Sequence, residues 1–328
     1  MHYVIYGAGA IGSVIGAHLH RAGRDVTLIA RGKHLEALQR DGLRLDTADG
    51  VLTLAIPAVG SPAEITWTDE TAVLLCVKSQ QTAGALETLA EVAPADTIVV
   101  SCQNGVANER EILRRFARTY AVPVVLPATH LEPGVVVQDS APSPGVLDCG
   151  RYPAGSDDVT ETLVTDFRAA GFGGTVRDDV MAWKYRKLLI NLGNGVEAAT
   201  AAGPAQDELV ARAWAEALAV YDAAGIVAVS DEEDAANRAA HITLRTDIVR
   251  PGGSTVQSMT RGSSVEVDFL SGEIVLLGRL HGVATPANEL VQHTVHRLVH
   301  ESLPPQSIDA ADLLARLHEH GKKDEIGL

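Results

Sequence analysis

Short apolar segments alternate with amphipathic stretches over the first half of the chain. Four segments have the continuous hydrophobicity of strands buried on both faces of a parallel sheet: 3–6, 25–30, 71–78 and 97–102. Shorter strand-like segments occur at 43–45, 51–54, 122–127, 135–137, 145–149 and 174–176. Helical periodicity occurs between them at 10–22, 35–40, 82–92, 109–119 and 157–169. This alternation predicts an α/β fold with a right-handed, doubly wound sheet.

The pattern changes near residue 178, where long helical segments replace the strands. These segments cover 180–192, 206–224, 231–246, 263–280 and 288–301. The sequence therefore predicts an α/β domain over residues 1–177 and an all-helical domain over residues 178–303. Residues 304–328 are expected to form a tail with one short helix, 310–320, and a charged end.

Composition places the chain among globular proteins and argues against several partners. At 328 residues it is long enough for two domains, and no apolar run approaches the roughly 20 residues of a membrane-spanning helix. The net charge of −15 argues against broad binding to nucleic acid or to anionic membranes. Cys76, Cys102 and Cys149 are widely spaced, and no signal peptide precedes the first strand. We therefore expect buried, reduced thiols in a cytoplasmic protein.

A glycine-rich motif joins the first strand to the first helix. It consists of six candidate cofactor-binding residues: Gly7, Ala8, Gly9, Ala10, Ile11 and Gly12. In a dinucleotide site the first glycine permits a tight turn, the second admits the pyrophosphate, and the third lets the helix pack on the sheet. The phosphates then meet unpaired N–H groups at the start of the helix. The alternative is a glycine-rich turn that binds nothing.

The end of the second strand indicates which dinucleotide would bind. An NAD site usually has an acidic residue here that holds the ribose hydroxyls. This chain has Arg31 and Lys33 instead, and cations suit a 2′-phosphate. The sequence therefore favours NADP(H) over NAD(H), unless both cations are ordinary solvated charges.

Two polar residues follow buried strands at the sheet edge where open α/β sheets bind ligands. Lys78 ends the segment 71–78, and Asn104 follows the segment 97–102. Both are candidate ligand contacts. The alternatives are a solvent-facing loop cation at Lys78 and a turn residue before glycine at Asn104.

The helix that opens the second half carries a lysine and two amides on one face. At about 100° per residue, Asn191 lies about 40° from Lys187, and Asn194 lies about 20° away on the other side. Substrates commonly bind between a nucleotide domain and a second domain, so this face is a candidate substrate site. A polar helix face in water is the alternative.

Together these segments resemble the ketopantoate reductase family, from the first residue to about residue 288. The matching features are GAGAIG, Arg31, Val77-Lys78, Gln103-Asn104-Gly105, Lys187-Leu188-x-x-Asn191, Ser254-Thr255-Val256-Gln257, and Val265-Glu266-Val267-Asp268 with Ser271-Gly272. The resemblance implies a Rossmann-type domain followed by a helical substrate and dimerisation domain, as in the 6-phosphogluconate-dehydrogenase-like fold. It also implies a homodimer and a place in pantothenate biosynthesis.

The same resemblance implies NADPH-dependent reduction of a 2-oxo acid, with 2-dehydropantoate (ketopantoate) to pantoate as the first choice. Lys187 matches the family's proton donor, and its ammonium suits an oxygen that gains negative charge as hydride reaches the ketone carbon. Glu266 is a second candidate catalytic residue, which holds a substrate hydroxyl or pairs with the lysine. Lys78 and Asn104 match positions that face cofactor and substrate. The candidate substrate contacts are Asn104, Lys187, Asn191, Asn194, Ser254 and Glu266.

The chain departs from the family pattern at several positions. The family's second helix asparagine is expected at Gly195, and Asn194 lies one position earlier. A further family asparagine has no match near Ala205. Thr255 replaces a methionine and Ser258 an aspartate. Another branched or hydroxylated 2-oxo acid is therefore an alternative substrate.

Two other functions stay open at this point. One is a related dehydrogenase that acts on a different hydroxy acid or an imine, and the other is a non-catalytic sensor that binds a dinucleotide without turnover. No metal is expected, although His293, His296 and His300 share a helix face, because no carboxylate or cysteine ligand is evident beside them.

Overall fold

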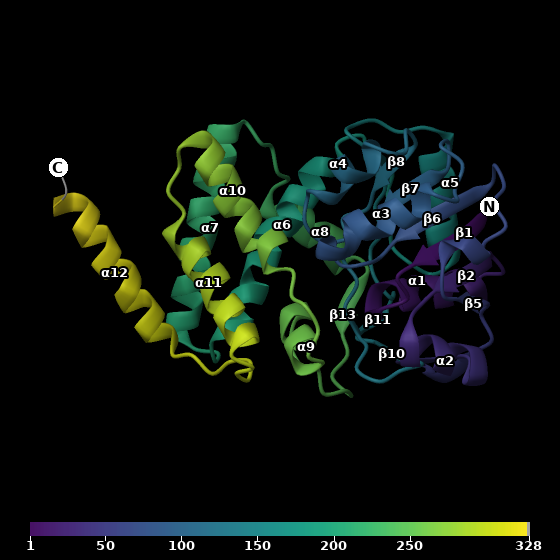
Figure 1. The fold of residues 1–328 in the computed structure, drawn as a ribbon, viewed down its shortest axis with the longest axis horizontal. Helices are drawn as coiled ribbons and strands as arrows, with labels where there is room; N and C mark the ends of the chain where they lie inside the picture. Colours follow the sequence, from purple (N-terminus) through teal and green to yellow (C-terminus); the bar gives the residue numbers. More distant parts are fainter. Residues whose placement is uncertain (327–328) are drawn as a thin grey trace. The chain divides into compact units, whose positions relative to one another are not determined.

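The computed structural model describes residues 1–326, with side chains to residue 319, and the chain divides into two compact units (Figure 1). Unit 1 comprises Met1–Lys184 and Ala228–Arg250. Unit 2 comprises Tyr185–Val227 and the chain from Pro251 onward. The sequence predicted a single change of domain at residue 178, and it did not indicate that a later segment returns to unit 1.

A seven-stranded sheet forms the centre of unit 1, in the order β12-β8-β7-β6-β1-β2-β5. Its strands are β1 (His2–Tyr6), β2 (Asp25–Ile29), β5 (Ala58–Val59), β6 (Thr71–Leu75), β7 (Ile98–Ser101), β8 (Thr119–Ala121) and β12 (Gly150–Arg151). All neighbours pair in parallel except β12 with β8. The chain order reverses between β1 and β6, which is the switch point where such sheets bind ligands. The predicted doubly wound sheet is confirmed.

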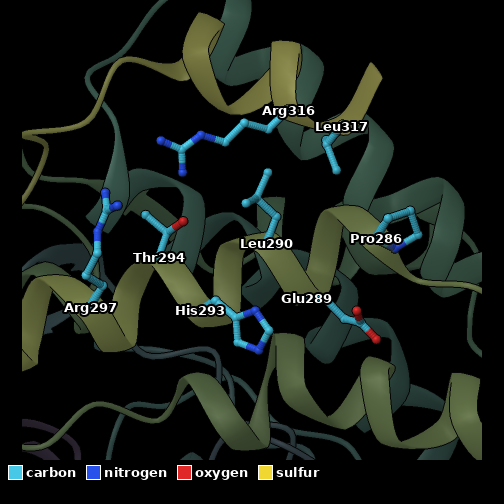
Figure 2. Close-up of a pocket in the computed structure, with 8 residues that line it drawn as sticks. All are labelled: Pro286, Glu289, Leu290, His293, Thr294, Arg297, Arg316 and Leu317. Carbon is cyan, nitrogen blue, oxygen red and sulfur yellow. The ribbon is translucent and has the colours of Figure 1, made fainter. Parts of the chain in front are cut away.

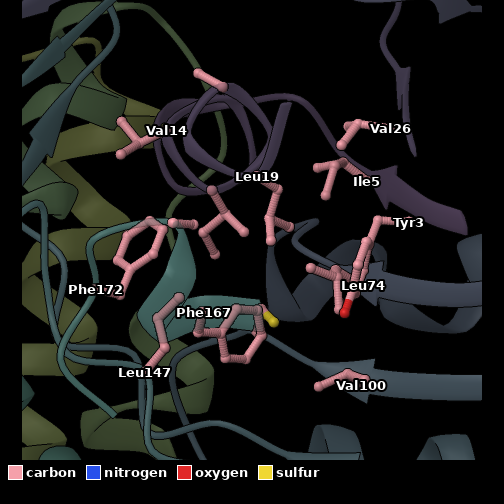
Figure 3. Close-up of a cluster of buried hydrophobic side chains, with 14 of the residues drawn as sticks. Tyr3, Ile5, Val14, Leu19, Val26, Leu74, Val100, Leu147, Phe167 and Phe172 are labelled. Carbon is pink, nitrogen blue, oxygen red and sulfur yellow. The ribbon is translucent and has the colours of Figure 1, made fainter. Parts of the chain in front are cut away.

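Helices cover both faces of this sheet. Alternate residues of its central strands are therefore buried in two separate clusters, one on each face. Tyr3 and Ile5 of β1 pack in one cluster with residues of α1, which Figure 3 shows, whereas Val4 and Tyr6 pack in the other. The helices and 3-10 turns of unit 1 are α1 (Ala10–Arg21), α2 (Gly32–Asp41), η1 (Pro62–Glu64), η2 (Ser79–Gln81), α3 (Thr82–Ala90), α4 (Asn108–Leu113), α5 (Asp158–Ala169) and α8 (Asp231–Ala239).

Two smaller sheets complete unit 1. One has the order β4-β3-β10-β9, formed by β3 (Leu43–Thr47), β4 (Gly50–Leu54), β9 (Ala128–Thr129) and β10 (Val135–Gln138). The other pairs β11 (Ser140–Pro142) with β13 (Ile242–Leu244). The predicted helix 231–246 is therefore wrong beyond Ala239, because the β-branched residues Ile242 and Thr243 pair with β11 instead. The predicted strands 122–127, 145–149 and 174–176 contribute only isolated bridges.

The regular elements of unit 2 in its described residues are all helices, and Thr200 and Ile308 form an isolated bridge. The helices are α6 (Val180–Ala199), which begins in unit 1, α7 (Pro204–Ala224), α9 (Ser254–Thr260), η3 (Val267–Phe269), α10 (Ser271–His281), α11 (Pro286–His300) and α12 (Ala310–Ile326). The predicted helix 263–280 begins only at Ser271. The Ser263 N–H donates to the Ser258 carbonyl after α9, and the Phe269 N–H donates to the Glu266 carbonyl in a 3-10 turn. These bonds hold the backbone out of an α-helix.

The three cysteines form no disulfide; Cys102 and Cys149 are buried as predicted, whereas Cys76 is only half-buried. Burial raises the pKa of the Cys149 thiol well above its usual value, so this thiol stays protonated at neutral pH. None of the helices in the described residues combines the length and hydrophobicity that crossing a bilayer requires.

Candidate active site

The turn between β1 and α1 is tight enough to need glycine at two positions. Gly7 has a φ of +106°, and a Cβ there would lie 2.8 Å from the backbone nitrogen of Val77. A Cβ on Gly12 would lie 2.3 Å from the Gly7 carbonyl oxygen and 2.8 Å from Cγ2 of Ile5. Side chains at these positions would push α1 away from the sheet.

Gly9 stands in a different environment from the other two glycines. A Cβ at this position would have no atom within 4 Å, so the space beside it is open. The backbone amides of Ala10, Ile11 and Gly12 have no acceptor among the described residues, as is usual in the first turn of a helix. This open space and these N–H groups form a cradle whose chemistry fits a pyrophosphate.

Two exposed cations stand where the chain leaves β2. Arg31 is the N-cap of α2, and Lys33 lies in its first turn. Because both side chains are exposed, a phosphate could pair with either one without a large desolvation cost. The adjoining His34 accepts a hydrogen bond at Nδ1 from the Gly134 N–H at 2.9 Å. Burial, and then the neighbouring His130, lower the pKa of His34 to about 4, so its ring is neutral at pH 7.

The turns after β6 and β7 are joined by hydrogen bonds into one corner of the sheet edge. The Ser79 hydroxyl donates to the Asn104 carbonyl at 3.2 Å, and Asn108 Nδ2 donates to the same carbonyl at 2.9 Å. The structure therefore brings the turns of Lys78 and Asn104 together. Lys78 is half-buried and adjoins Val77, the residue that abuts the Gly7 turn. We call the segments 77–82 and 103–108 the polar corner.

A buried ion pair lies beneath the polar corner. Lys184 Nζ donates to Glu109 Oε1, and the two side chains are 2% and 0% exposed. Sequence reasoning did not identify this pair. One signal was available, because Lys184 lies about 40° around α6 from the buried Leu188, on the apolar side of the helix.

The polar face of α6 lies within unit 2. Lys187 is half-buried and Asn191 is 4% exposed. Asn194 Nδ2 donates to the Ser254 hydroxyl at 3.4 Å, so the structure brings these two predicted residues together. Glu197, one turn further along α6, accepts the Gly253 N–H at 3.1 Å and so fixes the start of α9. Sequence reasoning overlooked Glu197.

The last candidate residue, Glu266, occupies less regular backbone. Glu266 is half-buried at the N-terminal end of η3, in the connection between α9 and α10, and does not lie on an α-helix.

Gly195 of α6 is packed against α11, because a Cβ there would lie 2.8 Å from Cγ1 of Val291. An asparagine at this position, where the family's second asparagine is expected, would therefore require Val291 to shift.

A pocket of about 410 Å³ lies between α11 and α12 of unit 2, and Figure 2 shows the residues that line it. His293 lines this pocket, together with Arg297 and Arg316, but none of the predicted site residues does. His296 Nε2 instead lies 2.6 Å from Asp268 Oδ1. The described residues contain no group of three or more His, Cys, Asp or Glu side chains that could hold a metal ion.

Comparison with known proteins covers nearly the whole chain. The family model described as "Ketopantoate reductase PanE/ApbA" matches residues 3–153, and its C-terminal counterpart matches residues 179–299. A 2-dehydropantoate 2-reductase of Pyrococcus horikoshii is 30% identical over 298 residues, covering 89% of this chain and 95% of that protein. Another, of Archaeoglobus fulgidus, is 32% identical over 300 residues, with the same two coverages, 89% and 95%.

A solved structure shows the same architecture. The PanE/ApbA family ketopantoate reductase of Ralstonia eutropha JMP134 superposes with a TM-score of 0.78 at 28% identity, covering 92% of this chain and 99% of that one. A ternary structure of D-mandelate dehydrogenase reaches the same TM-score, 0.78, at 22% identity, and covers 92% of this chain and 99% of that one. The fold predicted from the sequence is thereby confirmed.

Proposed function

This chain belongs to the ketopantoate reductase family, and we propose that it reduces 2-dehydropantoate to pantoate with NADPH. Family membership makes it an oxidoreductase that reduces a 2-oxo acid, with a nicotinamide dinucleotide as cofactor. The observation that carries the choice of substrate is the similarity, over nearly the full length, to relatives named 2-dehydropantoate 2-reductase. The reaction would be a step of pantothenate biosynthesis.

The preference for NADPH rests on the end of β2. Arg31 and Lys33 are exposed there, and no acidic residue occupies the place where ribose hydroxyls are usually held. Their two positive charges would pair with a 2′-phosphate, which NADH lacks. The first-turn amides of α1 and the open space beside Gly9 would receive the pyrophosphate.

The proposed chemistry assigns a role to five polar residues of unit 2. When bound, the reduced nicotinamide would supply a hydride to the ketone carbon, so negative charge would develop on the ketone oxygen. Lys187 would stabilise that oxygen and then donate an Nζ proton to it, leaving a neutral amine that solvent reprotonates. Asn191, Asn194 and Ser254 would orient the substrate carboxylate and hydroxyl without themselves titrating. Glu266 would hold a substrate hydroxyl or the ammonium of Lys187.

Lys184 is excluded as the proton donor by its surroundings. An ammonium has three N–H donors, and Lys184 Nζ faces Glu109 Oε1, the Gln103 carbonyl at 3.0 Å and the Ser101 hydroxyl at 3.5 Å. At 2% exposure its side chain is closed to a substrate. Lys187, half-buried on the polar face of α6, is the better candidate.

The test follows NADPH absorbance with purified protein and ketopantoate, for wild type and Lys187→Ala. Rapid oxidation that the substitution abolishes, with NADPH affinity unchanged, supports both the reductase and its proton donor. Oxidation with a different 2-oxo acid from a panel would replace the substrate but keep the reaction. Binding of NADPH without oxidation of any substrate would favour a dinucleotide sensor and overturn the proposal.

We also propose a homodimer formed through unit 2. Leu276 and Leu280 of α10 expose 50% and 68% of their surface, which is unusual for large apolar side chains one turn apart. Light scattering on the purified protein tests this, and a monomeric mass at micromolar concentration would contradict it. The cytoplasmic location predicted from the reduced cysteines is kept as a proposal, and fractionation of the cell tests it.

A further inference from the structure

The Lys184–Glu109 pair is a costly feature whose place in unit 1 needs an explanation. Removing two charges from water carries a penalty that their attraction seldom outweighs, so such a pair adds little net stability. The penalty is aggravated here because Glu109 Oε2 is buried without a hydrogen-bond partner among the described residues. A pair of apolar side chains of similar volume would occupy the same space without this loss of hydration free energy. A role in holding other groups accounts for the pair better than stability does.

The pair holds the backbone on which Asn104 depends. Lys184 Nζ donates to the carbonyl of Gln103, the residue just before Asn104, at 3.0 Å. It also lies 3.5 Å from the hydroxyl of Ser101, the last residue of β7. Glu109 itself belongs to the first turn of α4, which follows the same turn. Both ends of the segment 103–108 are therefore tied to one buried charge.

The hydrogen bonds continue from Gln103 to the neighbouring turn of Lys78. Gln103 Nε2 donates to the Val77 carbonyl and to the Thr82 hydroxyl, each at 2.8 Å. The Thr82 hydroxyl in turn donates to Asn108 Oδ1 at 2.8 Å. Asn108 Nδ2 donates to the Ser79 hydroxyl at 3.1 Å, which closes the network. Gln103, Thr82, Asn108 and Ser79 are all buried, so water competes poorly for these bonds.

We propose that Lys184 and Glu109 are positioning residues for the reaction. Their ion pair fixes the Gln103 carbonyl and, through the buried network, sets the backbone of the polar corner that carries Lys78 and Asn104. Both side chains are closed to solvent, so neither would touch cofactor or substrate. This inference rests on the proposed function in one respect, namely that the polar corner serves the cofactor and the 2-oxo acid.

The test compares two doubly neutral variants of unit 1. Lys184→Met with Glu109→Gln removes both charges, keeps unbranched side chains of similar length, and avoids leaving one charge buried alone. The matched control is Arg177→Met with Asp148→Asn, which removes an ion pair of 2.9 Å outside the polar corner, with Asp148 1% exposed. The single variant Glu109→Gln is made as well, and it is expected to lose the most stability.

Two readouts separate positioning from a general loss of stability. Amide hydrogen exchange in residues 77–82 and 103–108 should become at least tenfold faster in the Lys184/Glu109 variant, and stay within twofold in the control. The Kd for NADPH and the KM for ketopantoate should each rise at least tenfold in the first variant only. A lower Tm in both variants is compatible with this inference.

Unchanged exchange in the polar corner, with unchanged Kd and KM, would overturn the inference and leave the pair as a structural element. Faster exchange spread evenly over unit 1 would overturn it too. The exchange and NADPH-binding measurements need no turnover. If the wild-type protein reduces no 2-oxo acid, the proposed reaction fails while the positioning of the corner is still decided by exchange.

Discussion

Replacing Gly9 and Gly12 one at a time separates binding of the cofactor from the integrity of the fold. Both glycines belong to the same motif, yet their surroundings differ. A Cβ at position 12 would lie 2.3 Å from the carbonyl oxygen of Gly7, whereas a Cβ at position 9 would have no atom within 4 Å. We therefore expect Gly12→Ala to damage the protein, and Gly9→Ala to damage only the binding of the dinucleotide.

The expected magnitudes follow from these contacts. At Gly12 the helix must move by about 1 Å to restore an ordinary contact, and overpacking of this kind costs about 1–3 kcal/mol. The upper end applies because the obstructing atom at 2.3 Å is backbone. At Gly9 the φ is −79°, which alanine also adopts, and alanine loses less chain entropy on folding; this raises the free energy of unfolding by about 0.4–1 kcal/mol. Alanine is a poorer N-cap than glycine, which lowers the free energy of unfolding by a similar amount, so the net change in stability is about zero.

The assay combines chemical denaturation with calorimetric titration of NADPH. Gly9→Ala should unfold within about 0.5 kcal/mol of wild type, and it should bind NADPH at least tenfold more weakly because its methyl group occupies the phosphate cradle. The matched control is Gly84→Ala in α3, where nothing lies within 4 Å and the residue is exposed. This control should gain up to about 1 kcal/mol of stability without any change in affinity.

Two results would refute this reasoning. If Gly9→Ala binds NADPH as tightly as wild type, the open space beside Gly9 is not the pyrophosphate site. If Gly12→Ala is as stable as wild type, the close approach of α1 to the sheet does not constrain that position.

Three further predictions concern charge and protonation. Lys187→Met should lower kcat by about 10²–10⁴-fold, the usual contribution of a general acid, with little change in the Kd for NADPH; steady-state kinetics and titration check this. Arg31→Asp should raise the KM for NADPH at least tenfold and lower that for NADH, and a variant that keeps the wild-type ratio of the two would contradict the assignment. The pKa of His34 is about 4 in the folded chain against 6.5 in a free side chain. The unfolded state then binds more protons between these values, so the free energy of unfolding should fall as the pH drops from 6.5 to about 4. Urea denaturation at a series of pH values measures this, and for His34→Gln the free energy of unfolding should fall less steeply with decreasing pH than for wild type.

The sequence was informative wherever local chemistry determines structure. The strand β1, the turn at Gly7 and the helix α1 are encoded within a few neighbouring residues, and the structure has all three as predicted. Secondary structure was predicted wrongly where a segment pairs with a strand that is distant in the sequence. Residues 242–244 have helical neighbours in sequence, but they pair with β11, a strand about a hundred residues earlier, and nothing local signals that partner.

For the candidate site too, local sequence predicted some residues, whereas those that depend on distant contacts were missed. Lys78 and Asn104 were predicted as ligand contacts from their places after buried strands, and the turns that carry them are joined in the structure. The residues beneath them were not identified, because a lysine between aromatic residues, as in Trp183-Lys184-Tyr185, has no visible partner in sequence. Glu109 lies far from Lys184 along the chain, so only the fold brings the two charges together.

The departure at Gly195 has a physical explanation in unit 2. Position 195 faces α11, and a Cβ there would lie 2.8 Å from Cγ1 of Val291, so any larger residue would require Val291 to shift. Asn194 is half-buried on the adjoining face of α6, where its amide reaches the Ser254 hydroxyl at 3.4 Å. A shift of one residue turns a side chain by about 100° around a helix. Glycine at 195 therefore lets α6 pack closely on α11, and the preceding position, 194, is left to carry the amide.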